Sequence, residues 1–207
     1  MTAIEHKAIA RHEITGVILA GGRGSRLGGV DKGLVHMHGR PFVEHAIDAL
    51  RPQVGSLLIS ANRNRDVYAS YGFPVVADAM GDYDGPLAGM LSAMRVTETT
   101  YILVVPCDTP ALPSDLVERL ASALTHAQAE ASVVFCHGRM QPVFALMRSD
   151  VDDRLEQYMT AGARGAGEWM HRLGAVSVDF SDRADAFDNI NTPEELKRLE
   201  EKVLQQA

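Results

Sequence analysis

The residues best suited to chemistry lie in a glycine-rich loop near the start of this 207-residue sequence. The loop, 21–32, contains five glycines together with Arg23, Arg26 and Lys32, and it directly follows the apolar run Ile14–Ala20. Glycines let backbone N–H groups approach phosphate oxygens closely. Arginine and lysine supply the positive charge that those oxygens need. The loop therefore predicts a polyphosphate site, although a flexible surface loop also favours glycine and serine.

The spacing within this loop excludes two common phosphate-binding motifs. A Walker A loop needs G-x-x-x-x-G-K-[ST], but Lys32 follows Asp31 rather than a glycine. The dinucleotide fingerprint needs G-x-G-x-x-G, and a match starting at Gly22 and Gly24 reaches Leu27 at its last position. We expect Lys32 to contact phosphate, with a solvated surface lysine as the alternative. Asp31 is interpreted as a residue that orders the loop rather than as a ligand.

Asp108 is the strongest candidate for a metal ligand. It follows the apolar run Tyr101–Cys107, which is typical of a buried strand, and it precedes Thr109 and Pro110. Mg²⁺ prefers carboxylate, water and phosphate oxygens, so a carboxylate at the end of such a strand is well placed to hold it. Aspartate before Thr-Pro is also common in turns. On the residues alone, a turn role for Asp108 stays open.

Other polar residues follow the ends of neighbouring apolar runs. Ser60 and Asn62 stand at the end of the second run, and Asp78 stands at the end of the third. In open parallel sheets, ligands bind beyond the carboxyl ends of the strands. We therefore expect these side chains to converge with the glycine-rich loop and Asp108 at one edge of a sheet.

Two asparagines near the carboxyl end form a further candidate site. Asn189 and Asn191 flank Ile190, and alternation in an extended segment places both amides on one face. This spacing suits a clamp on Mg²⁺ or on an acceptor phosphate, from the second side of a cleft. Asn191 also precedes a capping box, Thr192 with Glu195, so a role in starting a helix stays open for it.

The elements that position these residues alternate between strands and helices. This alternation predicts one α/β domain over 14–207, with a mostly parallel sheet and helices on both faces. Strands follow one another closely in 131–190, which predicts a partly antiparallel half that closes one side of the cleft. The expected strands are Ile14–Ala20, Ser56–Ala61, Pro74–Asp78, Tyr101–Cys107, Ala131–His137, Met140–Met147 and Ala175–Phe180. The expected helices are Pro41–Leu50, Leu87–Arg95, Ser114–His126, Asp150–Ala161, Gly167–Leu173 and Pro193–Gln205.

Composition narrows the class of protein. The net charge is −7 at pH 7, so an extended nucleic-acid contact is not expected. No apolar run approaches the length of a membrane span. Cys107 and Cys136 form no C-x-x-C pair, which excludes a zinc or redox motif of that kind and fits a reduced, cytoplasmic setting. Residues 1–13 lack the apolar core of a secretory signal, and we expect them to form a disordered leader.

The glycine-rich loop resembles the signature of nucleotidyltransferases that activate phosphates and sugar phosphates. Its sequence from Leu19 to Gly33, Leu-Ala-Gly-Gly-Arg-Gly-Ser-Arg-Leu-Gly-Gly-Val-Asp-Lys-Gly, is similar to that of molybdenum cofactor guanylyltransferases. Further blocks match in order: Asp-Gly-Pro-Leu-Ala-Gly-Met at 84–90, Pro-Cys-Asp-Thr-Pro at 106–110 and Asn-Ile-Asn-Thr-Pro-Glu-Glu-Leu at 189–196. The resemblance extends over 14–200, and it implies a Rossmann-like nucleotidyltransferase fold.

The resemblance also implies an activity. A Mg²⁺-dependent enzyme of this family would join GMP from GTP to the phosphate of molybdopterin and release pyrophosphate. The guanine assignment depends on Gly21, because relatives that use CTP tend to have Leu-Ala-Ala-Gly in place of Leu-Ala-Gly-Gly. Cofactor-biosynthesis proteins or a recipient molybdoenzyme would be partners. The alternatives are a cytidylyltransferase, a sugar-phosphate nucleotidyltransferase and a non-catalytic carrier of the cofactor.

The same resemblance assigns roles to residues. Asp108 would be the Mg²⁺ ligand, and Lys32 and Arg26 would act in catalysis, although Arg26 could instead be solvated. Ser60 stands where the family often has an asparagine, a departure for which Asn62 could compensate. The implied nucleotide-binding residues are Leu19, Ala20, Gly21, Gly22, Lys32, Ser60, Asp78 and Asp108, and the implied acceptor clamp is Asn189 with Asn191.

Overall fold

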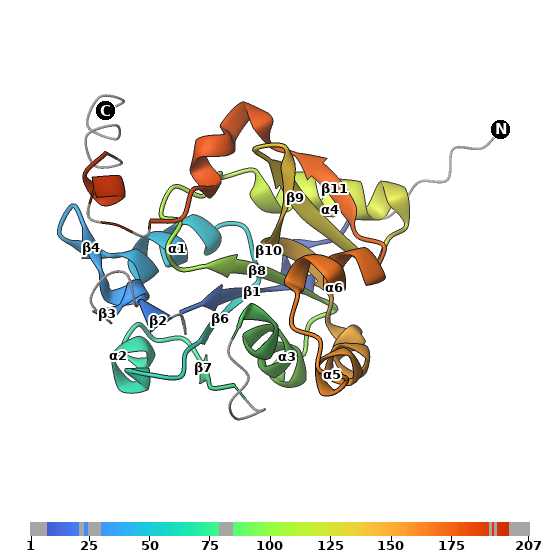
Figure 1. Cartoon of the computed structure of the whole chain (residues 1–207), viewed down its shortest axis with the longest axis horizontal. Coiled ribbons are helices and arrows are strands. Elements are labelled where there is room, and N and C mark those ends of the chain that lie inside the picture. The colour runs from blue at the N-terminus through green and yellow to red at the C-terminus, as the bar shows by residue number, and fades with distance from the viewer. Residues whose placement is uncertain are drawn as a thin grey trace.

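The fold is built on a mostly parallel sheet between two layers of helices (Figure 1). The structure, a computed structural model, describes residues 8–20, 23–24, 30–78, 85–190, 192 and 194–198. The seven strands of the sheet lie in the order β11-β9-β10-β8-β1-β6-β7, and β10 runs antiparallel to both of its neighbours. The bounds are β1 Ile14–Leu19, β6 Ser56–Ser60, β7 Val75–Val76, β8 Tyr101–Pro106, β9 Ala131–Cys136, β10 Arg139–Arg148 and β11 Val176–Asp179.

The predicted strands are confirmed, and β8 shows why the sequence reveals them. Ile102 and Val104 pack into the core on one face of the sheet, while Leu103 and Val105 pack into the core on the other face. A strand that is buried on both faces has no solvent-facing position, so its sequence is an unbroken apolar run. The antiparallel component expected in 131–190 is also confirmed, because it corresponds to β10.

Helices cover both faces of the sheet, as predicted. Val43 of α1 and Leu120 of α4 belong to one core, and Met90 of α3, Leu155 of α5 and Trp169 of α6 belong to the other. Figure 1 shows α1 and α4 above the sheet and α3 and α5 below it. Within the ranges described, no helix combines the length and apolar character needed to cross a bilayer. The bounds are α1 Phe42–Leu50, α3 Pro86–Val96, α4 Leu116–Ala127, α5 Asp152–Thr160 and α6 Ala166–Arg172.

Several short elements are not among the strands and helices expected above. The helix α2 spans Arg65–Ala69, and its one buried residue, Tyr68, is too little to produce a helical pattern. The 3₁₀ helices η3, Lys32–Leu34, and η5, Ser181–Phe187, are similarly irregular. Two-stranded ribbons are formed by β2, Arg23–Gly24, with β3, Val30–Asp31, and by β4, His36–Met37, with β5, Arg40–Pro41.

The last described helix begins at the capping box that the sequence predicts. Thr192 and Glu195 form the expected capping box: the Thr192 N–H donates to Glu195 Oε2 at 3.0 Å, and the Glu195 N–H donates to Thr192 Oγ1 at 3.2 Å. Residues 194–198 are helical, and the rest of the predicted last helix lies outside the described residues.

The domain begins earlier than the sequence predicts. Residues 8–13 were expected to belong to a disordered leader, but they include the 3₁₀ helix η1, Arg11–Glu13. Arg11 donates hydrogen bonds to the carbonyl oxygens of Val54 at 2.6 Å and Arg51 at 2.8 Å, just after α1. These bonds pair carbonyls of the turn that follows α1, so the segment is held against the domain. Residues 1–7 lie outside the described part.

Candidate active site

A cavity of about 260 Å³ lies at the carboxyl ends of β1, β6 and β8. This is the edge where the sequence places the candidate ligand-binding residues. The predicted residues that line the cavity are Leu19, Lys32, Ser60, Asn62, Asp78, Asp108 and Asn189. The structure therefore brings together side chains that are far apart in the sequence.

Lys32 and Asp108 form an ion pair in this cavity. Lys32 Nζ donates a hydrogen bond to Asp108 Oδ2 at 2.8 Å. Asp108 is held from both sides, because the Cys107 N–H donates to the Leu19 carbonyl at 3.0 Å and the Ile190 N–H donates to the Asp108 carbonyl at 3.0 Å. The backbone thus fixes the carboxylate next to the end of β1.

The second carboxylate oxygen of Asp108, Oδ1, is buried and differs from Oδ2 in its hydrogen bonding. Asp108 is only 5% exposed, and among the described residues its buried Oδ1 has no hydrogen-bond partner. Leaving a buried acceptor unpaired costs about 1–3 kcal/mol, so such atoms point to a missing ligand. Asp108 does lie in a turn, as the alternative has it, but the side-chain hydrogen bond within that turn comes from Thr109 Oγ1 to the Pro106 carbonyl at 3.1 Å.

Cys107 lines the cavity but is not suited to act as a nucleophile. Burial is the main cause that raises the pKa of its thiol, and the neighbouring Asp108 raises it further. A thiol in this state stays protonated near neutral pH, whereas a reactive cysteine needs the thiolate. Cys107 therefore contributes an apolar wall.

Asp78 and Asn62 form a second polar pair in the cavity. Asn62 Nδ2 donates to Asp78 Oδ2 at 2.7 Å, and the Asp78 N–H donates to Asn62 Oδ1 at 2.9 Å. Both groups of the Asn62 amide are thus engaged by Asp78. Ser60 is buried beside them at the end of β6, where its carbonyl accepts from the Ala20 N–H at 2.8 Å. Asn62 thus fixes Asp78 in place, and the compensating role considered for it stays a prediction.

The start of α3 closes another side of the cavity. Gly85 caps this helix with φ of 135°, a conformation open to glycine, and Pro86 follows at the first helical position. Gly89 faces the strand ends: a Cβ there would lie 2.6 Å from Ser60 Oγ and 2.9 Å from Leu19 Cδ2. The absence of a side chain at Gly89 therefore lets the helix approach the sheet. The N-terminus of a helix, with the N–H groups of its first turn and the positive end of its dipole, attracts anions.

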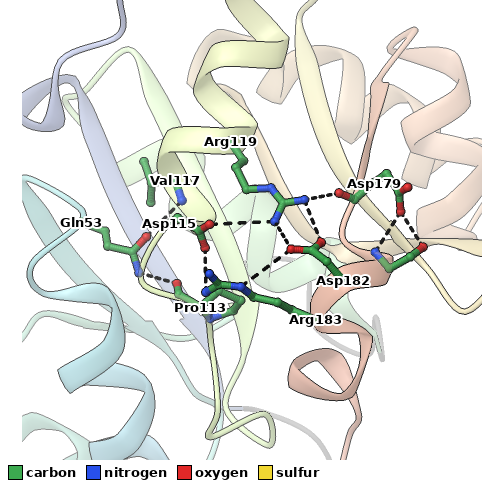
Figure 2. A network of polar contacts seen from close by, with 9 residues as sticks. Gln53, Pro113, Asp115, Val117, Arg119, Asp179, Asp182 and Arg183 are labelled. Atoms are coloured by element: carbon green, nitrogen blue, oxygen red, sulfur yellow. Dashed lines mark hydrogen bonds and ion pairs between the residues drawn. The ribbon is translucent and has the colours of Figure 1, made fainter.

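Asn189 reaches the cavity from the other half of the molecule through the segment η5. Figure 2 shows Arg119 of α4 directed at this segment, where its guanidinium donates to Asp182 at 3.0 and 3.1 Å and to the Asp179 carbonyl. The same guanidinium stacks 3.8 Å from the centre of the Phe180 ring. These hydrogen bonds lower the pKa of Asp182. The network ties the end of β11 to α4.

Aromatic packing continues from this network to the cavity. Phe187, at the end of η5, packs edge-on against Phe180 and Phe144, with ring centres 5.1 Å apart in both pairs. The chain then passes Asn189, and the Ile190 N–H reaches the Asp108 carbonyl. The position of Asn189 thus depends on packing that is remote in sequence.

A second cavity, of about 570 Å³, lies next to the first and shares Asn189 with it. His137 and Asp188 are in contact at its wall, with Nε2 and Oδ1 3.0 Å apart. Arg139, Gln141 and Arg198 also line it. Asn189 and Glu195 of its lining belong to the sequence block 189–196, but His137, Arg139 and Gln141 belong to no motif, so the sequence does not predict this cavity.

Some predicted residues are not brought into this site by the described structure. Ala20 is buried and is not among the residues that line the cavity. The phosphate-loop glycines Gly21 and Gly22, the Arg26 side chain and Asn191 lie outside the described residues, so their roles stay predictions.

With this geometry in view, the relatives of the chain become informative. The model of the MobA-like NTP transferase domain matches residues 16–176. The chain belongs to this family. A molybdenum cofactor guanylyltransferase of Shewanella loihica is 46% identical over 191 residues, covering 92% of this chain and 97% of the relative. Another, of Ralstonia nicotianae, is 47% identical over 203 residues, covering 94% and 99%.

A solved structure supports the fold independently. The molybdopterin-guanine dinucleotide biosynthesis protein A of Archaeoglobus fulgidus superposes with a TM-score of 0.77 at 24% sequence identity, covering 92% of this chain and 99% of that one. The family and the α/β nucleotidyltransferase fold inferred from the sequence motifs are therefore confirmed.

Proposed function

We propose that this protein transfers GMP from GTP to the phosphate of molybdopterin and releases pyrophosphate. The observation that carries the proposal is the Lys32–Asp108 pair, in which Asp108 is buried and its Oδ1 has no hydrogen-bond partner among the described residues. This pair lies in the cavity of a chain whose relatives are called molybdenum cofactor guanylyltransferases. In this reaction an oxygen of the acceptor phosphate bonds to the α-phosphorus of GTP. The bond from that phosphorus to the bridging oxygen breaks, and its electron pair leaves with pyrophosphate.

The protein accelerates such a transfer by positioning and by charge. Lys32 carries three N–H donors, so its ammonium can hold Asp108 and contact phosphate oxygens at the same time. A cation fixed where negative charge develops stabilises the transition state. The start of α3 and the pair Asn62–Asp78 then hold the rest of the nucleotide, which aligns the reacting atoms.

A divalent cation, which we propose to be Mg²⁺, fits the unpaired oxygen of Asp108. The described residues include no group of three or more His, Cys, Asp or Glu side chains suited to a metal. Mg²⁺ tolerates such a site, since it is often bound by one or two carboxylates and takes its other ligands from phosphate and water. When bound, it would neutralise phosphate charge and polarise the phosphoryl oxygens. Asp108 would hold it, and Lys32 would keep Asp108 oriented.

The two cavities suggest where each substrate lies. Asn189 belongs to both, so it marks the boundary across which the group is transferred. GTP would occupy the smaller cavity beside Lys32 and Asp108. The pterin of the acceptor would occupy the larger one, where Arg139, Gln141 and Arg198 offer donors to a polar heterocycle and its phosphate. The choice of guanine, the cytoplasmic location and a molybdoenzyme partner remain predictions from the sequence.

A nucleotide panel tests this function directly. Purified protein with Mg²⁺ and molybdopterin would receive GTP, CTP or ATP, and pyrophosphate release would be measured with and without the acceptor. We expect acceptor-dependent release, with kcat/KM for GTP at least about tenfold above the others, which corresponds to about 1.4 kcal/mol. Equal rates with CTP would contradict guanine specificity. Nucleotide binding without release in any arm would favour a carrier over an enzyme.

A further inference from the structure

The carboxylate next to Lys32 is turned away from the cavity. Asp31 is 9% exposed and is not among the cavity-lining residues, although Lys32 is. Its Oδ1 accepts a hydrogen bond from the Tyr68 hydroxyl at 2.5 Å and another from the Gly33 N–H at 3.3 Å. Its Oδ2 accepts from Asn64 Nδ2 at 2.9 Å. The negative charge of Asp31 is thus satisfied inside the fold.

Tyr68 and Asn64 make these bonds from α2, which follows the β6 strand end. Tyr68 is fully buried, and Asn64 precedes the helix in the left-handed conformation, with φ of 51°. Burial raises the pKa of the Tyr68 hydroxyl, and the hydrogen bond to Asp31 raises it further. Tyr68 therefore remains a neutral donor over the physiological range of pH.

The contact continues on the far side of Lys32. A Cβ on Gly33 would lie 2.4 Å from the Tyr68 hydroxyl, so the backbone of η3 rests directly on this side chain. Asp31 also belongs to β3, where it is paired with Arg23 of β2 across the glycine-rich loop. Both chain neighbours of Lys32 are therefore fixed by Tyr68, and the base of the loop is fixed with them.

We propose that Tyr68 is a positioning residue for nucleotidyl transfer, acting through Asp31 and Gly33 to hold Lys32 against Asp108. Asn64 assists by binding the other oxygen of Asp31. This inference rests on the proposed function, in which Lys32 contacts the phosphates of GTP. A second consequence is that Asp31 cannot turn toward Lys32 and compete with phosphate for its charge. A displacement of about 1 Å can cost up to about 10²-fold in rate, so a single hydroxyl can matter here.

Tyr68→Phe tests the proposal, because it removes the hydroxyl and keeps the ring. We expect kcat for pyrophosphate release to fall by about tenfold, with KM for GTP changed by less than about threefold, since the ordering of Lys32 matters most in the transition state. Tyr71→Phe is the matched control: it makes the same change just after α2, and the rate should not move. In a Lys32→Ala background, Tyr68→Phe should cause no further loss.

Each result bears on the proposal. An equal loss from Tyr68→Phe in the wild-type and Lys32→Ala backgrounds would overturn it, since Tyr68 would then act independently of Lys32. So would a rate like that of Tyr71→Phe. Asn64→Gly is a second variant that keeps left-handed backbone but removes the amide, and it should lower kcat in the same direction. A crystal structure of Tyr68→Phe gives a readout that needs no activity: the proposal expects the 2.8 Å contact between Lys32 Nζ and Asp108 Oδ2 to be lost. An unchanged contact there would overturn the proposal, whereas a wild-type protein inactive with every nucleotide would count against the proposed function.

Discussion

Two charged clusters of this molecule differ in a way that separates function from stability. At the cavity, Lys32 meets Asp108, which is buried and has one oxygen without a hydrogen-bond partner among the described residues. In the cluster of Figure 2, Arg119 and Arg183 face Asp115 and Asp182. Asp115 Oδ1 also lacks a hydrogen-bond partner among the described residues, but the Arg183 guanidinium lies 3.3 Å from it, so every one of these carboxylate oxygens lies near a cation. These aspartates are partly or largely exposed.

Burial and the pairing of each charge distinguish the two clusters. An exposed network in which each charge has a partner contributes modestly to stability and needs no ligand to complete it. A buried carboxylate that keeps an acceptor unpaired is costly to the fold, which is tolerable when a ligand completes it. Substitutions at the cavity should therefore reduce activity and spare stability. Substitutions in the cluster of Figure 2 should reduce stability and spare activity.

Asp108→Asn should have the largest effect on activity. The amide keeps the size of the side chain but offers a much weaker ligand to a cation, so turnover should fall by roughly 10³-fold. The melting temperature should be unchanged or higher, because a buried charge is removed. Pyrophosphate release and thermal unfolding check the two effects. Asp182→Asn, the same change in the other cluster, should keep its activity; near wild-type turnover of Asp108→Asn would remove Asp108 from the metal role.

Lys32→Ala should reduce turnover by about 10²-fold or more, the usual order for losing one preorganised charge at a developing phosphate anion. Lys32→Arg should restore only part of the rate, because a planar guanidinium cannot reproduce the contacts of a compact ammonium. Steady-state kinetics with GTP measures both. Unchanged kinetics for Lys32→Ala would make this residue a surface lysine.

Arg119→Ala should affect stability rather than activity. It removes a cation–π contact and the bonds to η5, which together are worth about 1 kcal/mol at an exposed site. For a chain of this length, that lowers the melting temperature by about 2–4 °C. Turnover should stay within about threefold of wild type. A loss of activity as large as that of Lys32→Ala would show that the network acts on the site through Asn189.

The smallest expected effect is a pH dependence of the stability difference between wild type and Arg119→Ala. The folded protein holds the pKa of Asp182 below its ordinary value of 3.8, mainly through the hydrogen bonds from Arg119. A lowered pKa stabilises the folded state above the ordinary value, and this contribution is lost as the pH falls through the folded pKa. The gap in unfolding free energy between wild type and Arg119→Ala should therefore narrow below about pH 4. Denaturant unfolding across this range measures it, and a gap that widens in acid would contradict the assignment.

The sequence predicts the sheet and singles out Asp108 because their signals are local. Runs such as Ile102–Val105 are apolar throughout, and Asp108 follows directly after one of them. Lys32 stands out because it ends a glycine-rich loop that also carries Arg23 and Arg26. Each of these features is recognisable within a short stretch of chain.

Contacts between distant segments explain what the sequence does not predict. The sequence suggests that Asp31 orders the loop, but it does not reveal that Tyr68, 37 positions away, is the partner of Asp31. The sequence likewise does not reveal that the Asn62 amide binds Asp78. The second cavity depends on the path of η5 along the sheet. The packing of Phe187 against Phe144 fixes that path.

The measurement that tests the central claim most directly is the effect of Mg²⁺ on GTP binding. Isothermal titration of wild type and Asp108→Asn, each with Mg²⁺ and with a chelator, isolates the contribution of the unpaired Oδ1. The claim predicts that Mg²⁺ strengthens GTP binding to the wild type by about tenfold or more and that Asp108→Asn loses this gain while its metal-free affinity changes little. The same Mg²⁺ enhancement in both proteins would contradict it.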